Sequence, residues 1–226
     1  KNVAMQLKGG IHLLDPTSES YLGRNFDCVT YIYADDDQTD LWGDEASLVA
    51  EIDRVCDIVR WPGGKYVEFL KSIAPSFLRP YQRIFVVLDD IMFDTPLKNW
   101  NYYKFVEIAE RNNLTVASPG ITGSTAGLFM HPSINSSPTI KFRRNVPEGT
   151  VGRLVSSVEV QATIFTPAAF KCFTELLDVK RNFYGWHYDS YFNQFCASKV
   201  PGWRMGIIDD IEVCTPILKR TLVFCL

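Results

Sequence analysis

Apolar runs of strand length alternate with amphipathic segments along most of the chain. The runs are rich in β-branched side chains and end in turn residues, which is typical of buried strands; they cover residues 2–7, 26–33, 84–91, 114–117, 155–165, 203–208 and 211–214. Between them, helical periodicity covers residues 45–54, 65–74, 99–113, 167–179 and 188–197. Strands that alternate with helices predict an α/β fold with a mainly parallel central sheet flanked by helices.

One section breaks this pattern. Residues 121–152 are rich in Gly, Ser, Thr, Asn and Pro and include a basic patch at 141–144, so they predict a long functional loop with one edge strand. The chain has 226 residues, which is enough for one substantial core, and residues 1–226 are expected to form a single domain. The abrupt apolar ending indicates a domain cut from a longer protein.

Composition narrows the classes of partner. Hydrophobic residues make up 46% and charged residues 22% of the chain, as in ordinary globular proteins. No apolar run reaches the roughly 18 residues of a membrane-spanning helix, so no transmembrane segment is expected. The formal net charge is −3, without a long basic block, and nucleic acid is therefore not expected as a partner.

Six cysteines are scattered along the chain, at positions 28, 56, 172, 196, 214 and 225. No Cys-x-x-Cys pair and no histidine at zinc-finger spacing accompanies them, so a zinc site is not expected. Most of them lie in apolar stretches, which favours buried free thiols over disulfides. The sequence therefore predicts an intracellular, reducing compartment, the cytoplasm.

The strand predicted at 84–91 runs into two adjacent carboxylates, Asp89 and Asp90. In an open α/β sheet, ligands bind beyond the carboxyl ends of the strands, so this pair is placed to hold a divalent cation and a diphosphate. The alternative is turn or helix-capping chemistry, in which Asp accepts backbone N–H groups. The surrounding order of helix, strand, acidic pair, helix and strand favours a ligand site.

Several blocks of the chain have the order and spacing of the corresponding blocks in a known protein family: 32–35, 41–42, 65–71, 81–91, 114–120, 158–165, 185–189 and 206–209. In these blocks the chain resembles the DUF707 proteins of plants and microbes, which are glycosyltransferase-like and have a GT-A type nucleotide-diphospho-sugar fold. The resemblance implies a Rossmann-like single domain. A glycosyltransferase domain of a large algal virus is the kind of protein that it suggests.

The same resemblance implies a UDP-sugar as donor, a carbohydrate or glycan as acceptor, and Mn²⁺ or Mg²⁺ as cofactor. The family usually carries Asp-x-Asp at the acidic strand tip, whereas Leu88 occupies the first position here. The metal ligand carried over is therefore Asp90, with Asp89 beside it at the donor. The late histidine of GT-A enzymes falls near 213–215, where no histidine stands, which leaves Asp209 as a further candidate ligand.

Two more residues are candidates for binding the donor. Lys65 follows two glycines at the start of a predicted helix, where backbone N–H groups and the ammonium can meet phosphates; a solvated helix lysine is the alternative. Asp35 lies in an acidic run after the second predicted strand and can contact uracil or ribose hydroxyls. An ordinary acidic surface turn is the alternative there.

Asp189 is the predicted catalytic base of an inverting transfer. It begins a predicted helix shortly after Trp186, which can stack on the apolar face of a sugar while Asp189 takes the proton of the acceptor hydroxyl. The family block also places an acid at this position. The alternative is a carboxylate favoured there by the helix macrodipole, and a structural role is expected for the neighbouring His187.

A metal-dependent glycosyltransferase is thus the leading functional hypothesis. A non-catalytic carbohydrate-binding protein on the same fold is the second, because the first Asp and the late histidine of the family are missing. A phosphotransferase or phosphatase with Asp89 as nucleophile is weaker, since the chain has no Gly-x-x-x-x-Gly-Lys-Ser/Thr loop.

Overall fold

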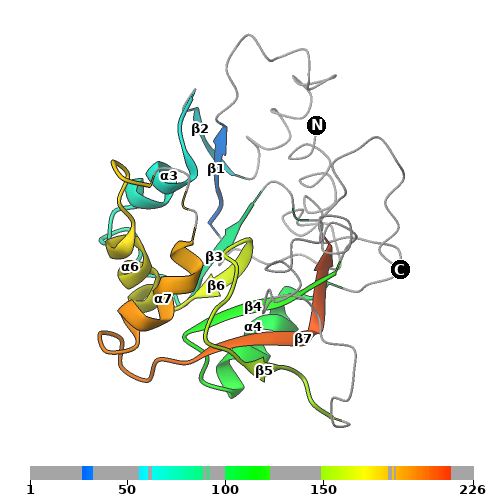
Figure 1. The fold of residues 1–226 in the computed structure, drawn as a ribbon. Helices are drawn as coiled ribbons and strands as arrows, with labels where there is room; N and C mark the ends of the chain where they lie inside the picture. Colours follow the sequence, from blue (N-terminus) through cyan, green and yellow to red (C-terminus); the bar gives the residue numbers. More distant parts are fainter. Residues whose placement is uncertain are drawn as a thin grey trace.

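The computed structural model describes residues 27–32, 56–60, 63–88, 91, 100–122, 149–182, 185 and 187–214. They form a mixed α/β structure around a five-stranded sheet (Figure 1). Its strands are β3 (Ile84–Val87), β4 (Val116–Thr122), β5 (Arg153–Leu154), β6 (Ala162–Phe165) and β7 (Met205–Cys214). The helices are α3 (Tyr66–Ser72), α4 (Tyr102–Arg111), α6 (Pro167–Leu176) and α7 (Tyr188–Cys196). A separate small sheet pairs β1 (Val29–Ile32) with β2 (Asp57–Arg60).

The order across the five-stranded sheet is β3, β6, β4, β7, β5. β6 is antiparallel to β3 and β4, β5 is antiparallel to β7, and β4 and β7 are parallel. The α/β class is confirmed, but the expectation of a mainly parallel sheet is wrong for the five-stranded sheet. A strand buried on both faces shows the same apolar pattern in either direction, so the pattern did not reveal that β6 is antiparallel to its neighbours.

Three strands of the sheet nevertheless share a direction. β3 and β4 are both antiparallel to β6, and β7 is parallel to β4, so β3, β4 and β7 all run the same way. Their last residues, Val87, Thr122 and Cys214, mark one side of the sheet, which we call the carboxyl edge. Ligand sites of α/β proteins form at such an edge.

Side chains alternate between the two faces of the sheet, and each face packs against different helices. One face places Val116, Phe165 and Ile207 in a core with side chains of α3, α6 and α7. The adjacent residue of each strand points the other way and packs with α4: Ala117, Ile164 and Ile208. The sheet therefore lies between two helical layers, as Figure 1 shows.

Local sequence explains where two of the helices begin. The side-chain oxygen of Asn101 accepts the backbone N–H of Lys104 at 2.9 Å and caps α4. Thr166 caps α6 by accepting the N–H of Ala169 at 3.3 Å, and Pro167 occupies the first turn, where a missing N–H leaves no unmade helical bond. Such caps stabilise a helix by about 1 kcal/mol each.

The predicted helices in the described part of the chain are confirmed with modest shifts in extent. Those expected at 65–74, 99–113, 167–179 and 188–197 correspond to α3, α4, α6 and α7. The predicted strand at 155–165 is shorter, because only its last four residues form β6. The elements expected at 2–7 and 45–54 and the basic patch at 141–144 lie outside the described residues.

The two short strands predicted at 203–208 and 211–214 are one strand, β7, with a bulge in its middle. Pro119 of β4 pairs with Ile208, but the next residue, Gly120, pairs with Glu212. Asp209, Asp210 and Ile211 are therefore extra residues on β7. Bulges of this kind recur beside functional sites, where they redirect side chains.

The small sheet packs against α3 through aromatic contact. The rings of Tyr31 on β1 and Phe69 on α3 are stacked with centroids 4.8 Å apart. The hydroxyl of Tyr31 also lies 2.9 Å from the hydroxyl of Ser72 at the end of α3. The position of this sheet is thus tied to the same helix that Lys65 precedes.

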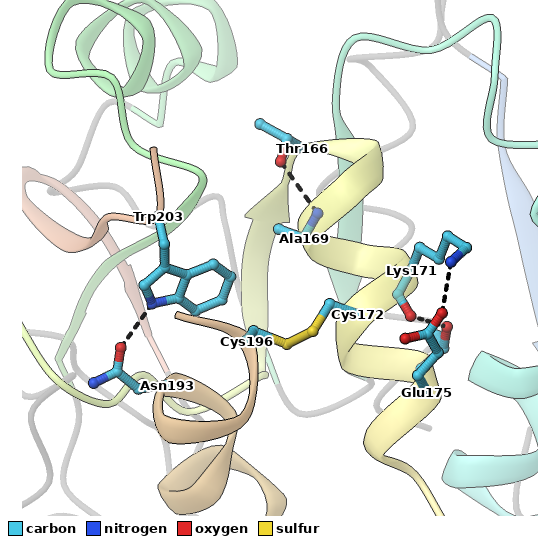
Figure 2. Close-up of a disulfide and its surroundings, with 9 residues drawn as sticks. Thr166, Ala169, Lys171, Cys172, Glu175, Asn193, Cys196 and Trp203 are labelled. Carbon is cyan, nitrogen blue, oxygen red and sulfur yellow. Dashed lines mark hydrogen bonds and ion pairs between the residues drawn. A yellow bond between two sulfur atoms is a disulfide. The ribbon is translucent and has the colours of Figure 1, made fainter. Parts of the chain in front are cut away.

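Four of the cysteines form two disulfides, Cys28–Cys56 and Cys172–Cys196. The second joins α6 to α7, with Cα atoms 5.9 Å apart (Figure 2). The prediction of buried free thiols is wrong for these residues, because packing brings together cysteines that are 24 and 28 positions apart in sequence. Disulfides persist in oxidising environments, so the pairing points away from a reducing cytoplasm.

Within the described ranges, none of the helices combines the length and the apolar character that a membrane crossing requires.

Candidate active site

The carboxyl edge gathers several of the predicted site residues. Leu88 follows β3 directly and precedes Asp89 and Asp90 in the sequence. Its backbone N–H donates to the carbonyl oxygen of Gln161 at 2.8 Å, so the turn that leads into β6 lies beside the segment that leads to the acidic pair. Asp89 and Asp90 themselves lie outside the described residues.

Residues 159–161 form a tightly bonded turn before β6. The backbone N–H of Gln161 donates to the carbonyl of Glu159 at 2.9 Å, and the hydroxyl of Thr163 donates to the same carbonyl at 3.1 Å. The hydroxyl of Tyr66 donates to the carbonyl of Val160 at 3.2 Å. Because Tyr66 is the first residue of α3, this bond holds the amino end of the helix against the turn.

Lys65 immediately precedes α3 and is half-buried. Its backbone N–H donates to the carboxylate of Glu68 at 2.8 Å, which is the return contact of a capping box. The bond between Tyr66 and the turn therefore also places Lys65 near the carboxyl edge. The role of Lys65 in binding the donor stays a prediction.

The approach to α7 passes over the start of α3. Gly185 has φ +79°, and a Cβ added there would lie 3.2 Å from the ring of Tyr66 and 3.2 Å from a methyl of Val67. His187, just before the helix, is also left-handed at φ 67°, a conformation that costs a non-glycine residue energy. The left-handed conformations of Gly185 and, two positions later, of His187 thus let the chain turn sharply into α7.

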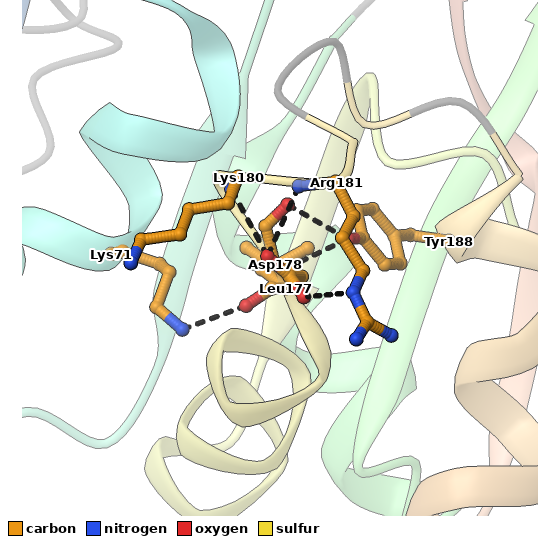
Figure 3. Close-up of polar contacts among 6 residues, drawn as sticks. All are labelled: Lys71, Leu177, Asp178, Lys180, Arg181 and Tyr188. Atoms are coloured by element: carbon orange, nitrogen blue, oxygen red, sulfur yellow. Dashed lines mark hydrogen bonds and ion pairs between the residues drawn. The ribbon is translucent and has the colours of Figure 1, made fainter.

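Hydrogen bonds to the end of α6 fix the first residue of α7 (Figure 3). The hydroxyl of Tyr188 accepts the N–H of Asp178 at 2.7 Å and lies 3.3 Å from the Asp178 carbonyl, to which it donates. Nearby, the ammonium of Lys71 on α3 donates to the carbonyl of Leu177 at 2.7 Å. The Cys172–Cys196 disulfide (Figure 2) adds a covalent link between the same two helices.

Asp189 lies in the first turn of α7 and is half-buried. Its carboxylate accepts the backbone N–H of Ser190 at 2.9 Å, and its carbonyl accepts the hydroxyl of Ser157 at 3.2 Å. Burial and, secondarily, the negative charge of Asp189 raise the pKa of Tyr66 above its ordinary value. Tyr66 therefore keeps its proton and acts as a neutral donor beside a carboxylate.

Asp209 is held by a different contact. The guanidinium of Arg153 on β5 lies 3.0 and 3.2 Å from its two carboxylate oxygens, and the side chain of Asp209 is 11% exposed. The carboxylate of Asp209 is therefore already paired with a cation, although its remaining lone pairs could still accept. Its role as a ligand of Mn²⁺ or Mg²⁺ stays a prediction.

Two other predicted site residues, Asp35 and Trp186, lie outside the described residues, as Asp89 and Asp90 do. Among the residues that are described, no group of three or more His, Cys, Asp or Glu side chains is placed to hold a metal ion. The structure thus brings Tyr66, the residue after Lys65, into contact with the turn before β6 and Asp189 into contact with Ser157, and it gives Asp209 a separate partner.

Three residues at the carboxyl edge were missed in the sequence. Tyr66 and Gln161 connect α3, β6 and Leu88, as described above. Glu212 pairs with Gly120 near the end of β7, between Ile211 and Val213, which both pack on the α4 side; it therefore faces the side of α3 and α7. The usable signal was a carboxylate placed between two apolar residues of a strand, which carries a burial cost unless it has a role.

An open depression of about 410 Å³ lies elsewhere, on residues 197–204 between α7 and β7. One of its residues, Lys199, places its ammonium 3.3 Å from the centre of the Phe195 ring. Trp203 donates its indole N–H to Asn193 at 2.7 Å (Figure 2). This depression precedes the first residue of β7, so it lies at the end of the strand opposite to the carboxyl edge.

In comparison with known proteins, no protein-family model matches the chain and no curated protein matches its sequence.

Proposed function

We propose that the chain is a glycosyltransferase that moves a sugar from a nucleotide sugar, a UDP-sugar, to a carbohydrate acceptor with inversion, on a GT-A type fold. The observation that supports this proposal is the hydrogen bond of Tyr66, at the start of α3, to Val160, which is next to the Leu88–Gln161 bond at the end of β3. Lys65 precedes Tyr66 in the sequence, and the half-buried Asp189 is close enough to raise the pKa of Tyr66.

In this proposal Asp189 is the catalytic base. As the acceptor hydroxyl oxygen bonds to the anomeric carbon, its proton passes to the carboxylate of Asp189 and the bond to the diphosphate breaks, releasing UDP. A base must be positioned as well as basic. The Tyr188–Asp178 bonds hold the start of α7, and the disulfide attaches its last residue, Cys196, to α6. Lys65 binds the negative charge of the diphosphate.

Asp90, with Asp89 beside it, remains the proposed metal ligand. A bound Mn²⁺ or Mg²⁺ would supply charge neutralisation of the departing diphosphate. Asp209 is the weaker candidate of this set, because its carboxylate is already paired with Arg153. Asp35 and Trp186 keep their proposed roles at the nucleoside and at the sugar face.

The direct test measures nucleoside diphosphate release from a panel of UDP- and GDP-sugars with Mn²⁺, Mg²⁺ or EDTA, with and without simple sugar acceptors. Metal-dependent release from one donor is expected. Asp189→Asn and Asp90→Asn should each lower turnover at least a hundredfold while the circular dichroism spectrum is unchanged. Asp210→Asn is the matched control, because Asp210 is an exposed carboxylate near β7's bulge, paired with Lys104 at 3.6 Å. Unchanged turnover in both site variants would refute the assignment.

A second function is favoured by the Arg153–Asp209 pair. If the pairing of Asp209 with Arg153 means that the site binds no metal, a non-catalytic carbohydrate-binding protein is the alternative. It predicts that calorimetry detects binding of glycans and none of any nucleotide sugar, with or without Mn²⁺. Binding of a UDP-sugar would exclude it.

A further inference from the structure

Gln161 has a buried side-chain oxygen that accepts no hydrogen bond from the protein. Most buried polar atoms in native proteins are paired, and those that are not call for an explanation such as a bound ligand. The backbone of Gln161 is fully used, since its carbonyl accepts the N–H of Leu88 and its N–H donates to Glu159. The side-chain oxygen is therefore the buried polar atom of this residue that is left without a partner.

The position of Gln161 relates this oxygen to the proposed donor site. Its carbonyl lies 2.8 Å from the backbone nitrogen of Leu88, the residue before Asp89 in the sequence. The preceding residue, Val160, accepts the hydroxyl of Tyr66, whose proton is retained because of burial and the nearby Asp189. Gln161 thus lies between the end of β3 and the amino ends of α3 and α7.

The chemistry of an amide oxygen limits what it can bind there. It accepts hydrogen bonds and donates none. The diphosphate of a nucleotide sugar is ionised at neutral pH and offers only acceptors, so it is excluded as the partner. The groups on either side of the diphosphate, the ribose and the transferred sugar, both carry hydroxyls that can donate.

We propose that the side-chain oxygen of Gln161 accepts a hydrogen bond from a hydroxyl of one of the two sugar rings that flank the donor diphosphate. This inference rests on the proposed glycosyltransferase function. It makes Gln161 a specificity-determining residue, because a site with a buried acceptor discriminates against a ligand that lacks the matching hydroxyl.

The test compares wild type with Gln161→Met, which keeps the length of the side chain and removes its polar atoms. Binding of the UDP-sugar that is turned over, and of UDP alone, is measured by calorimetry together with the melting temperature. The variant is expected to bind the UDP-sugar at least tenfold more weakly and to melt at the same temperature or higher, because an unpaired buried oxygen has been removed. Gln194→Met, at an exposed position of α7, is the matched control and should bind as wild type does.

The two ligands separate the two sources of the hydroxyl. Equal weakening for UDP and UDP-sugar assigns the bond to the ribose, and weakening for UDP-sugar alone assigns it to the transferred sugar. Unchanged affinity for both ligands, in a variant that still turns over donor, overturns the role of Gln161 and leaves the glycosyltransferase proposal intact. If wild type binds no UDP- or GDP-sugar, both proposals fall. Gln161→Leu replaces the Met variant if that one does not fold.

Discussion

The guanidinium of Arg153 bridges both carboxylate oxygens of Asp209, at 3.0 and 3.2 Å, and so joins the short edge strand β5 to the bulge of β7. The pair is largely buried, with side chains 24% and 11% exposed. Removal of one partner leaves a charge with little access to water, which is costlier than removal of both.

We therefore expect Arg153→Met and Asp209→Leu each to lower the free energy of unfolding by about 2–4 kcal/mol. The double variant should lie closer to wild type than either single variant. Urea unfolding measures all three. Lys171→Ala is the control, because its ion pair with Glu175 at 2.6 Å is exposed on α6 and should contribute less than about 0.5 kcal/mol. Additive single effects would show that the two side chains do not interact.

Tyr188→Phe should destabilise the start of α7. The variant loses the hydroxyl that bonds both the N–H and the carbonyl of Asp178, a change that costs about 1–2 kcal/mol. If Asp189 is the base, turnover should also fall, because its helix is less firmly placed. Tyr191→Phe is the control, since Tyr191 is 60% exposed on the same helix. Equal unfolding midpoints for the two variants would contradict the anchoring role.

Gly185→Ala should cost more stability than Gly149→Ala. Both glycines have similar left-handed backbones, φ +79° and +81°, but a Cβ at Gly185 would crowd Tyr66 and Val67, whereas one at Gly149 would meet nothing within 4 Å. The backbone penalty of about 1 kcal/mol is shared, so the difference between the variants reports the packing of Gly185 on α3. Thermal melts in the same buffer give this difference. Equal melting temperatures for the two variants would contradict the close packing of Gly185 against α3.

Replacing both Cys172 and Cys196 by Ala should lower the free energy of unfolding by about 3–4 kcal/mol, the loop-closure entropy expected for a link across 24 positions. Reduction of the wild type with dithiothreitol during unfolding should remove at least the same amount. Mass spectrometry after alkylation of the unreduced protein checks the premise. Alkylation of Cys172 or Cys196 without reductant would contradict it.

The protein should become less stable in alkaline solution, because the folded state disfavours ionisation of the Tyr102 hydroxyl. The pKa of Tyr102 is raised from 10.0 to about 12, mainly by burial, although the positive charge of Arg83 acts to lower it. The unfolded chain releases this proton first, so the contribution to stability is intact below pH 10 and is lost as the pH rises to about 12. Urea unfolding at pH 9 and pH 11 should show a smaller pH effect in Tyr102→Phe than in wild type. Tyr191→Phe is the control and should leave the pH effect as it is, because Tyr191 is 60% exposed on α7 and does not act on Tyr102.

Local signals predicted the helices well. Asn101 and Thr166 are capping residues next to amphipathic segments, and such contacts span only three positions. Strand direction depends instead on how the chain returns to the sheet. β6 lies between β3 and β4 although it follows both in sequence, and no pattern within β6 encodes that placement.

The residues of the candidate site were likewise predictable from sequence only where local signals determine their positions. The positions of Lys65 and Asp189 at helix starts were predictable from glycine turns and helical periodicity. That Asp209 is paired with Arg153 was not, because 56 positions separate the two residues and only the β5–β7 pairing brings them together. The disulfides were missed for the same reason, since no motif marks cysteines that meet through helix packing.

The bulge in β7 changes which residues of that strand belong to which side of the molecule. Before it, the even-numbered Ile208 points toward α4; at its last residue and after it, the odd-numbered Ile211 and Val213 do. The extra residues thus shift the parity of the strand, and it is this shift that turns Glu212 toward α3 and α7. Deleting a single residue, such as Asp210, would exchange the two sides for the whole end of β7, sending Val213 toward the candidate site and Glu212 into the apolar layer beneath it.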